Sequence, residues 1–337
     1  MKVAVLGGGS WGVSIANVLN DNKNEVSLYF RDQSQIDHIK EHGKSDKYLK
    51  DFTFPKDIRL SSDIYDAIKD SEVIVLATPL QVIEDILIKI KPYIDSNNQV
   101  ILVNASKGIH FKRLKTASDI VKDILGDVRF VALSGPSHAE EVSKRLNTTV
   151  VSASLNEEVA CIIQDLFMND YFRVYVHNDV LGVEMASALK NVIAIGAGIL
   201  TGLEQGDNAK AALITRGLFE ISKLGKAFGC SMYTFMGLAG MGDLIATANS
   251  VHSRNFRAGL LIGKGVAIKD VSANIGETVE GMVTAKAAYT LSKQYHVSMP
   301  ITKEIYEVLY EDKDPKEAIF ELMTRPKKHE FMEVMEI

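Results

Sequence analysis

The fold of this chain is decided by Gly7-Gly8-Gly9-Ser10-Trp11-Gly12, which directly follows the apolar run Lys2–Leu6. A run this short and this apolar predicts a buried strand, and the pattern after it predicts a helix over Ser10–Asn20. The hexapeptide has the spacing G-x-G-x-x-G at Gly7, Gly9 and Gly12. Between a strand and a helix, such glycines permit a tight turn, a close approach of backbone amides to phosphate, and close packing of the helix on the strand. The stretch therefore predicts that a dinucleotide pyrophosphate binds at the start of the helix.

Further short runs rich in β-branched residues alternate with amphipathic helical segments through the first half of the chain. These runs are Glu25–Phe30, Glu72–Ala77, Gln99–Val103, Arg129–Leu133 and Thr148–Ala153. Several are continuously apolar, which is typical of strands covered by helices on both faces. Strands that alternate with helices indicate βαβ units, so we predict a parallel, doubly wound, Rossmann-like sheet.

The second half of the chain has a different pattern, with helical spacing throughout. The predicted helical segments are Leu181–Leu203, Ala209–Phe228, Asn255–Lys264, Thr284–Gln294 and Ile301–Glu311. A chain of 337 residues is long enough for two cores. We therefore predict an α/β protein with a dinucleotide-binding domain over residues 1–178 and an all-helical substrate and catalytic domain over residues 179–337.

Composition excludes several classes of protein. The net charge of −5 does not favour nucleic acid or an anionic membrane as a partner. Cys161 and Cys230 are far apart in sequence, which fits a reducing, cytoplasmic setting, and His38 and His42 lack a third metal ligand. The apolar stretch Val192–Leu203 is too short to span a bilayer, and the N-terminus does not resemble a signal peptide. We expect a soluble protein without a metal site.

Two charged residues after the second predicted strand bear on the type of dinucleotide. Asp32 lies at the distance where a carboxylate binds the ribose 2′-hydroxyl of NAD, and Arg31 beside it could bind the 2′-phosphate of NADP. Charges at a strand end are also common on solvated surfaces. The sequence favours NADPH and leaves NADH possible.

Polar residues cluster where predicted strands end. Lys107 follows the strand Gln99–Val103, and Ser134-Gly135-Pro136-Ser137-His138 follows Arg129–Leu133. The carboxyl edge of such a sheet is where ligands bind, so Lys107 is a candidate cation for an anionic substrate. His138 is better explained as a local hydrogen-bonding residue than as an acid or base.

Lys190 lies among small apolar residues on its predicted helix, which would desolvate it and lower its pKa. A lysine at a helix edge with its amine in solvent fits the same pattern. Asp243 could orient Lys190 or simply cap a helix. Ser253 is a natural N-cap, and Arg254 and Asn255 beside the free amides could bind phosphate or lie on a capped surface helix.

Ordered sequence blocks over residues 2 to about 325 resemble bacterial NAD(P)-dependent glycerol-3-phosphate dehydrogenases. The blocks are GGGSWG, ASKGI, LSGPSHAEE, GVEMASALKNVIAIGAG, GDNAKAALITRGL, GLAGMGDL, HSRNF and TVEGM. The resemblance implies a cytoplasmic homodimer that interconverts sn-glycerol 3-phosphate and dihydroxyacetone phosphate and supplies glycerol 3-phosphate for phospholipid synthesis.

The resemblance also implies roles for individual residues. Lys190 would be the general acid/base, and Asp243 a second catalytic residue. The substrate would contact Lys107, Gly135, Ser137, Lys190, Asp243, Thr247, Ser253, Arg254 and Asn255. The cofactor would contact Gly7, Gly9, Ser10, Trp11, Gly12, Arg31, Tyr48, Lys107, Ala139, Arg254 and Glu280.

Three alternatives compete with this interpretation. A 3-hydroxyacyl-CoA or 3-hydroxyacid dehydrogenase shares the two-domain plan, but the former would need a catalytic His where the first helical segment offers Lys190. A nucleotide-sensing regulator would need a basic face or an extra binding module. A degenerate enzyme retained as a binding protein would not need the full set of polar candidates.

Overall fold

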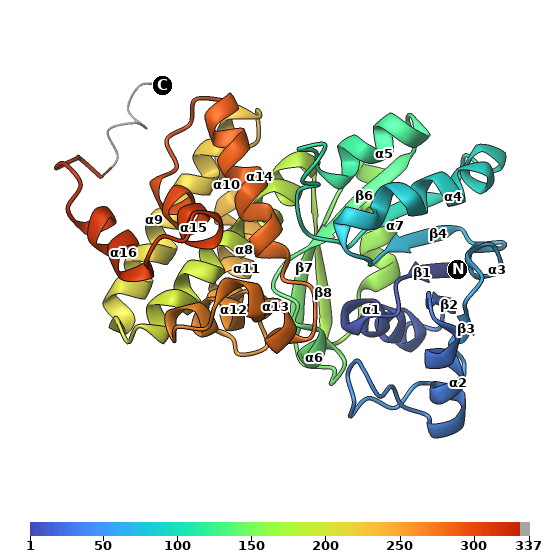
Figure 1. The fold of residues 1–337 in the computed structure, drawn as a ribbon. Helices are drawn as coiled ribbons and strands as arrows, with labels where there is room; N and C mark the ends of the chain where they lie inside the picture. Colours follow the sequence, from blue (N-terminus) through green and yellow to red (C-terminus); the bar gives the residue numbers. More distant parts are fainter. Residues whose placement is uncertain (331–337) are drawn as a thin grey trace.

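A computed structural model describes residues 1–330, with one sheet in the first half of the chain and helices in the second (Figure 1). The strands are β1 (Lys2–Leu6), β2 (Glu25–Tyr29), β3 (Arg59–Ser61), β4 (Val73–Leu76), β5 (Ile101–Asn104), β6 (Arg129–Ser134), β7 (Thr148–Ala153) and β8 (Phe172–His177). They form a sheet in the order β3-β2-β1-β4-β5-β6-β7-β8. The chain starts in the middle and builds outward first to one edge and then to the other, as predicted for a doubly wound fold.

The sheet is not entirely parallel, which corrects the sequence prediction. β7 pairs antiparallel with β6, with Leu133 opposite Ser152, while β7 and β8 are parallel to each other. Only the short helix α6 (Ala139–Val142) separates β6 from β7. The four residues of α6 span about 6 Å, which is too short to carry the chain back along a six-residue strand of about 20 Å, so β7 returns in the opposite direction.

Helices cover both faces of the sheet. They are α1 (Ser10–Asp21), α2 (Gln33–His42), α3 (Ile64–Ile68), the 3₁₀ helix η1 (Leu80–Val82), α4 (Ile83–Ser96), α5 (Ala117–Leu125) and α7 (Glu157–Phe167). Alternate residues of β1 enter different cores: Val3 and Val5 pack with α1, α2 and α7, whereas Ala4 and Leu6 pack with α3, α4 and α5. The continuous apolar strands are therefore buried on both sides, as their sequence predicted.

The first turn confirms the geometry expected of the glycine motif. Gly7 has a φ of +137°, a conformation that other residues rarely adopt. A Cβ added to Gly12 would lie 1.8 Å from the Gly7 carbonyl oxygen, whereas a Cβ on Gly9 would meet nothing within 4 Å. Gly12 is thus required for packing, and the space beside Gly9 is open for a ligand.

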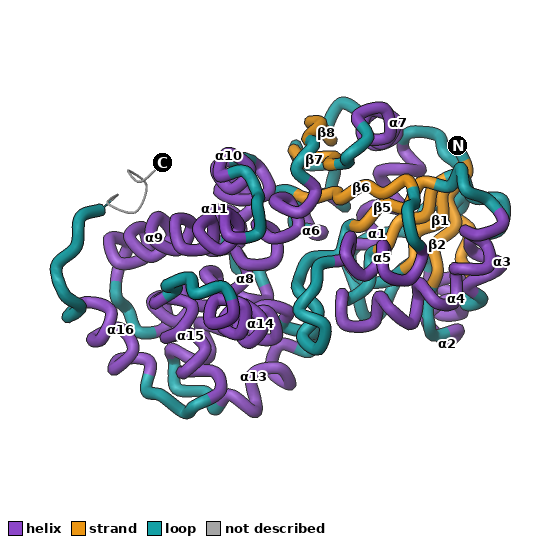
Figure 2. Tube along the Cα trace, turned by 90° about the horizontal axis from the view of Figure 1, so that it is seen from above, coloured by secondary structure: helices purple, strands orange, loops and turns teal. Residues whose placement is uncertain are grey.

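The second half is helical throughout the described residues and packs beside the sheet (Figure 2). Its elements are α8 (Val180–Gly202), α9 (Gly206–Ala227), α10 (Met232–Met236), the π-helical turn η2 (Leu238–Gly242), α11 (Asp243–Asn249), α12 (Arg254–Gly263), α13 (Ile268–Ile275), α14 (Glu280–Gln294), α15 (Pro300–Tyr310) and α16 (Pro315–Met323). The prediction of a helical second half is confirmed, while its boundary at residue 178 stays a prediction. The last residues of the predicted domain, 331–337, lie outside the described part of the chain.

Helix α8 forms the centre of this half. It packs against α12 so closely that a Cβ on Gly198 would lie 2.1 Å from the Phe256 carbonyl oxygen. By length and composition α8 could cross a membrane, although the shorter stretch identified from sequence could not. Its apolar window is entirely buried inside the protein, so α8 is the helix around which the second core forms.

Candidate active site

Two lysines share one buried carboxylate at the carboxyl edge of the sheet. Lys190 Nζ lies 2.8 Å from Asp243 Oδ1, and Lys107 Nζ lies 2.6 Å from Asp243 Oδ2. Thr247 accepts a hydrogen bond from Lys190 Nζ and donates one to Asp243 Oδ1. The side chains of Lys190 and Asp243 are only 5% and 3% exposed, so these charges interact with little screening by water.

Three separate elements bring the cluster together. Lys107 follows the carboxyl end of β5, Lys190 lies midway along α8, and Asp243 begins α11 directly after the turn η2. Asp243 and Thr247 are four residues apart on α11 and therefore face the same way. The residues around Lys190 and Asp243 left their pairing open in the sequence, and the structure brings the two side chains together.

The electrostatics of the cluster favour proton transfer by Lys190. Burial lowers the pKa of Lys190 to about 8, with the charge of Lys107 acting in the same direction and Asp243 opposing both. Burial alone would raise the pKa of Asp243, but the charges of Lys107 and Lys190 outweigh it and lower that pKa. Asp243 is therefore a fixed anion, and the proton that can move belongs to Lys190.

The segment after β6 forms one wall of the cluster. The Gly135 carbonyl oxygen accepts hydrogen bonds from Lys107 Nζ at 3.0 Å and from Ser137 Oγ at 2.9 Å. His138 Nε2 lies 3.4 Å from the Ala246 carbonyl oxygen, and burial lowers the pKa of His138. Ala139 begins α6, and its carbonyl oxygen accepts from Ser14 on α1, which places α6 beside the glycine motif. His138 thus contacts α11, 108 residues further along the chain, so the sequence interpretation of a local hydrogen bond is not confirmed.

The start of α12 offers groups for an anion. Ser253 caps the helix by accepting from Phe256 N at 3.1 Å, as predicted from sequence. Arg254 Nη1 pairs with Glu277 Oε2 at 3.2 Å, and both side chains are partly exposed. Asn255 Oδ1 accepts from Gly281 N at 2.9 Å, and within residues 1–330 its Nδ2 makes no hydrogen bond. An incoming phosphate would find the Arg254 guanidinium and the Asn255 amide N–H groups at a helix N-terminus.

The N-terminus of α1 fits the pyrophosphate of a dinucleotide. Gly9 is its N-cap and contributes no capping side chain, and no acidic residue lies in the first turn. The amides of Ser10, Trp11 and Gly12 precede the first intrahelical bond, which Val13 N makes to the Gly9 carbonyl oxygen, and are thus available for phosphate, with open space beside Gly9. Trp11 Nε1 donates to the Ala105 carbonyl oxygen at 3.1 Å, which fixes the indole beside the loop of Lys107.

Three proposed cofactor contacts lie outside the lysine cluster. Arg31 lies between β2 and α2, and Tyr48 lies six residues after the end of α2. Glu280 begins α14 and is partly buried. Burial raises the pKa of Glu280, while the charges of Arg254, Lys107 and Lys190 oppose that shift. Glu280 is electrostatically part of the site, which the sequence alone could not show.

Sequence reasoning missed one charged residue of this region. Glu184 and Lys190 are the charged residues of the otherwise uncharged stretch Val180–Gly202. A carboxylate in a helix that is apolar on all sides must be buried, and Glu184 is 5% exposed. That pattern was the available indication that Glu184 has polar partners.

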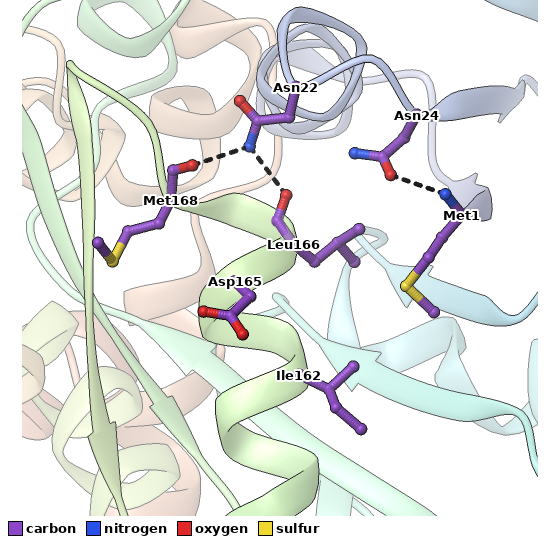
Figure 3. Close-up of a pocket in the computed structure, with 7 residues that line it drawn as sticks. All are labelled: Met1, Asn22, Asn24, Ile162, Asp165, Leu166 and Met168. Carbon is purple, nitrogen blue, oxygen red and sulfur yellow. Dashed lines mark hydrogen bonds between the residues drawn. The ribbon is translucent and has the colours of Figure 1, made fainter.

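Two hollows on the surface are lined by other residues than those of the lysine cluster. One, of about 510 Å³, lies between the end of α1 and α7, where Asn22 Nδ2 donates to the carbonyl oxygens of Leu166 and Met168 (Figure 3). Met1, which precedes β1, also lines it, so it lies at the amino edge of the sheet. The other, of about 540 Å³, runs beside α1 between the segment 49–55, α6 and His252. Ligands of doubly wound sheets bind at the carboxyl edge, so the first hollow is not the candidate site.

Both halves of the chain match family descriptions of one enzyme. Residues 2–160 match the family described as NAD-dependent glycerol-3-phosphate dehydrogenase N-terminus, and residues 179–320 match the C-terminus of the same enzyme. A relative from Thermoanaerobacter sp. (strain X514), named glycerol-3-phosphate dehydrogenase (NAD(P)+), is 48% identical over 98% of this chain and 99% of its own length. One of the same name from Bacillus subtilis (strain 168) is 46% identical over 99% and 97%.

A solved structure agrees with the sequence matches. The crystal structure of glycerol-3-phosphate dehydrogenase from Coxiella burnetii superposes with a TM-score of 0.92 at 34% identity, covering 96% of this chain and 99% of that chain. Both halves of the sequence, the nearly full-length relatives and the fold thus agree. The chain is a member of the NAD(P)-dependent glycerol-3-phosphate dehydrogenase family of oxidoreductases.

Proposed function

We propose that this chain reduces dihydroxyacetone phosphate to sn-glycerol 3-phosphate with NADPH, and catalyses the reverse oxidation. The observation that carries the proposal is the Lys107–Asp243–Lys190 cluster, which joins the loop after β5 to α8 and α11. This arrangement offers a proton donor, an anion that orients it, and cationic groups for a phosphorylated substrate.

Lys190 would donate the proton that the reduced carbonyl oxygen needs. When bound, the nicotinamide supplies a hydride to the C2 carbonyl carbon of the substrate. Negative charge then develops on the carbonyl oxygen, and Lys190 stabilises that charge and donates its proton. Asp243 and Thr247 hold the Lys190 amine in place, since both are hydrogen-bonded to Nζ. Lys107, whose Nζ shares the Asp243 carboxylate with Lys190, would add a second positive charge near that oxygen.

The remaining groups bind and orient the two ligands. Arg254 and Asn255 would hold the substrate phosphate at the start of α12. The other proposed substrate contacts are Gly135, Ser137, Ser253 and Thr247. The proposed cofactor contacts are Gly7, Gly9, Ser10, Trp11, Gly12, Arg31, Tyr48, Lys107, Ala139, Arg254 and Glu280.

The pH dependence of the reaction follows from Lys190. Ketone reduction requires the protonated amine, whose pKa is about 8 in the free enzyme. We therefore expect kcat/KM for reduction to be level at lower pH and to fall about tenfold per pH unit above that value. Oxidation of glycerol 3-phosphate should rise with pH through the same range. Initial rates measured from pH 6 to 10 in both directions check this, and a reduction rate that is flat to about pH 10 would contradict it.

The proposed preference for NADPH follows from the different surroundings of Arg31 and Asp32, the two charged residues after β2. Asp32 is the N-cap of α2, and its Oδ1 accepts from Ser34 N at 3.0 Å and from Ser34 Oγ at 2.8 Å. This carboxylate is therefore engaged in capping, whereas Arg31 is exposed at the start of α2. A guanidinium in that position suits the 2′-phosphate of NADPH.

Replacement of Arg31 tests this preference. In Arg31→Ala, kcat/KM for NADPH should fall about 10- to 100-fold, the value of a charge-assisted contact, while kcat/KM for NADH should change less than about twofold. Lys40→Ala, on the last turn of α2, is the matched control and should leave both values unchanged. An equal loss for both cofactors would show that Arg31 does not contact the 2′-phosphate.

The reaction itself is tested with the purified chain and dihydroxyacetone phosphate, following NADPH and NADH absorbance in parallel. Oxidation that depends on the substrate supports the proposal, and dihydroxyacetone without phosphate should react far more slowly. Cofactor binding without turnover would leave the dinucleotide fold in place and refute the substrate.

Family membership makes the alternatives from the sequence less favourable. Asp243 is hydrogen-bonded to Lys190, Lys107 and Thr247 rather than to a histidine, unlike the site expected of a 3-hydroxyacyl-CoA dehydrogenase. A regulator or degenerate binding protein would not need a buried lysine with a lowered pKa.

We also propose a cytoplasmic homodimer that supplies glycerol 3-phosphate for phospholipid synthesis. The family resemblance supports the dimer and the pathway, and the unpaired thiols of Cys161 and Cys230 suit a reducing compartment. Sedimentation equilibrium of the purified protein tests the dimer, and a monomer at micromolar concentration would refute it.

A further inference from the structure

Glu184 forms a buried polar link between the two halves of the chain. It lies in the second turn of α8, and its carboxylate reaches into the sheet-containing half. Oε1 accepts from Asn104 Nδ2 at 3.3 Å and from Ser118 N at 3.1 Å, and Oε2 accepts from Ser118 Oγ. All these donors are neutral. Burial raises the pKa of Glu184 to about 7, while its hydrogen bonds oppose that shift.

One partner of Glu184, Asn104, also holds the loop that carries Lys107. Asn104 ends β5, and its amide closes on the backbone of Ser106: Nδ2 donates to the Ser106 carbonyl oxygen and Oδ1 accepts from Ser106 N, both at 3.1 Å. Lys107 is the next residue and donates to Asp243. The same Asn104 side chain thus shapes the loop that carries Lys107 and contacts the helix that carries Lys190.

The hydrogen bonds of Glu184 fix the position of α8 relative to β5, which the neighbouring apolar contacts do not. Val180 and Val183 of α8 pack against Ala132 of β6 and Val151 of β7. Apolar contacts are non-directional and tolerate sliding, whereas hydrogen bonds weaken steeply when donor and acceptor move out of line. Lys190 is six residues from Glu184, about 9 Å along the helix, so a movement of α8 at Glu184 is transmitted to the Lys190 amine.

We propose that Glu184 is a positioning residue for the reaction, which aligns Lys190 with Lys107 by holding α8 against the Asn104 side chain. It does not touch the substrate or the cofactor. The inference rests on the proposed function only for its kinetic effect, since the alignment of the two lysines is a property of the free protein.

An exchange of donor and acceptor tests the link. Asn104→Asp replaces the donor with a second carboxyl group. Because the pKa of Glu184 is already about 7, the two groups can share a proton at neutral pH, so all variants are compared at about pH 9, where two ionised carboxylates repel each other. There kcat should fall about tenfold or more relative to the wild type at the same pH, with the affinity for NADPH unchanged. Glu184→Gln keeps one acceptor oxygen for Asn104 and Ser118 N, and its amide can donate to Ser118 Oγ, so kcat should stay within about twofold. In the double variant the amide of Gln at position 184 can donate to the carboxylate of Asp at position 104, and kcat should recover at least about threefold relative to Asn104→Asp.

Ser118→Ala is the matched control. It loses a hydrogen bond to the same carboxylate but leaves Asn104 in place, and its kcat should stay near the wild-type value.

Three outcomes would overturn the proposal: a wild-type kcat in Asn104→Asp, no recovery in the double variant, or an equal loss in Ser118→Ala. A second readout is independent of turnover. Acetic anhydride should acetylate Lys107 several-fold faster in Asn104→Asp than in the wild type, relative to the loop residue Lys112. An unchanged ratio of the acetylation rates of Lys107 and Lys112 contradicts the positioning role of Glu184, whatever the substrate is. If the wild-type enzyme is inactive on dihydroxyacetone phosphate, only the proposed function is refuted.

Discussion

Lys190→Ala should lower kcat for the reduction of dihydroxyacetone phosphate by at least about a thousandfold. The substitution removes both the proton donor and the nearest positive charge to the developing oxyanion, and each of these contributions is large in a site shielded from water. The fold should survive, because Asp243 keeps its ion pair with Lys107. Steady-state kinetics at saturating NADPH measure the effect.

Cofactor binding provides the control for this variant. The chain has one tryptophan, Trp11, and it lies within the glycine motif. Quenching of its fluorescence by NADPH should give the same dissociation constant in Lys190→Ala as in the wild type. Lys112→Ala, in the loop before α5, should leave both kcat and quenching unchanged. Near-normal turnover of Lys190→Ala would exclude Lys190 as the general acid.

Arg254→Ala should lower kcat/KM for dihydroxyacetone phosphate by about a hundredfold, the value expected for loss of a charge-assisted phosphate contact. The wild-type guanidinium can leave the carboxylate of Glu277, because that pair is partly exposed and an exposed pair contributes little stability. Substrate can therefore displace Glu277 from Arg254 at small cost. Initial rates over a range of substrate concentrations measure the loss.

A substrate without phosphate separates binding of the phosphate from other effects of Arg254. Dihydroxyacetone lacks the group that Arg254 would bind, so its low rate should change far less in Arg254→Ala than that of dihydroxyacetone phosphate. Arg257→Ala, one turn further along α12, serves as the matched control and should behave like the wild type. Equal losses of kcat/KM with both substrates would show that Arg254 does not bind the substrate phosphate and would leave it only a role in cofactor binding.

Local patterns predicted most of the fold. The apolar runs that became β1, β4 and β5 are buried on both faces, so their sequence reflects their surroundings directly. The strands β3 and β8 were not predicted. β3 has only three residues, and β8 alternates buried and exposed residues at an edge of the sheet, where fewer positions need to be apolar. The direction of β7 depends on its connection, whose helix α6 is too short to cross back along the sheet, and not on the residues of β7.

The site was less predictable than the fold, because its parts come from distant segments. Lys190 and Asp243 are 53 residues apart, and Lys107 and Asp243 are 136 apart. Composition around Lys190 indicated a desolvated amine, but only the packing of α11 against α8 supplies its carboxylate. The cap at Ser253 was predictable, since capping involves neighbouring residues. The pairing of Arg254 with Glu277 was not, because it joins the start of α12 to the loop before α14.

The central claim is that this chain transfers hydride to C2 of dihydroxyacetone phosphate. The most direct test supplies the wild-type enzyme with dihydroxyacetone phosphate and NADPH that carries deuterium at both C4 positions, followed by mass spectrometry and proton NMR of the product. We predict glycerol 3-phosphate with one deuterium at C2 and none elsewhere. Product without deuterium at C2, or no product although NADPH binds, would contradict the account.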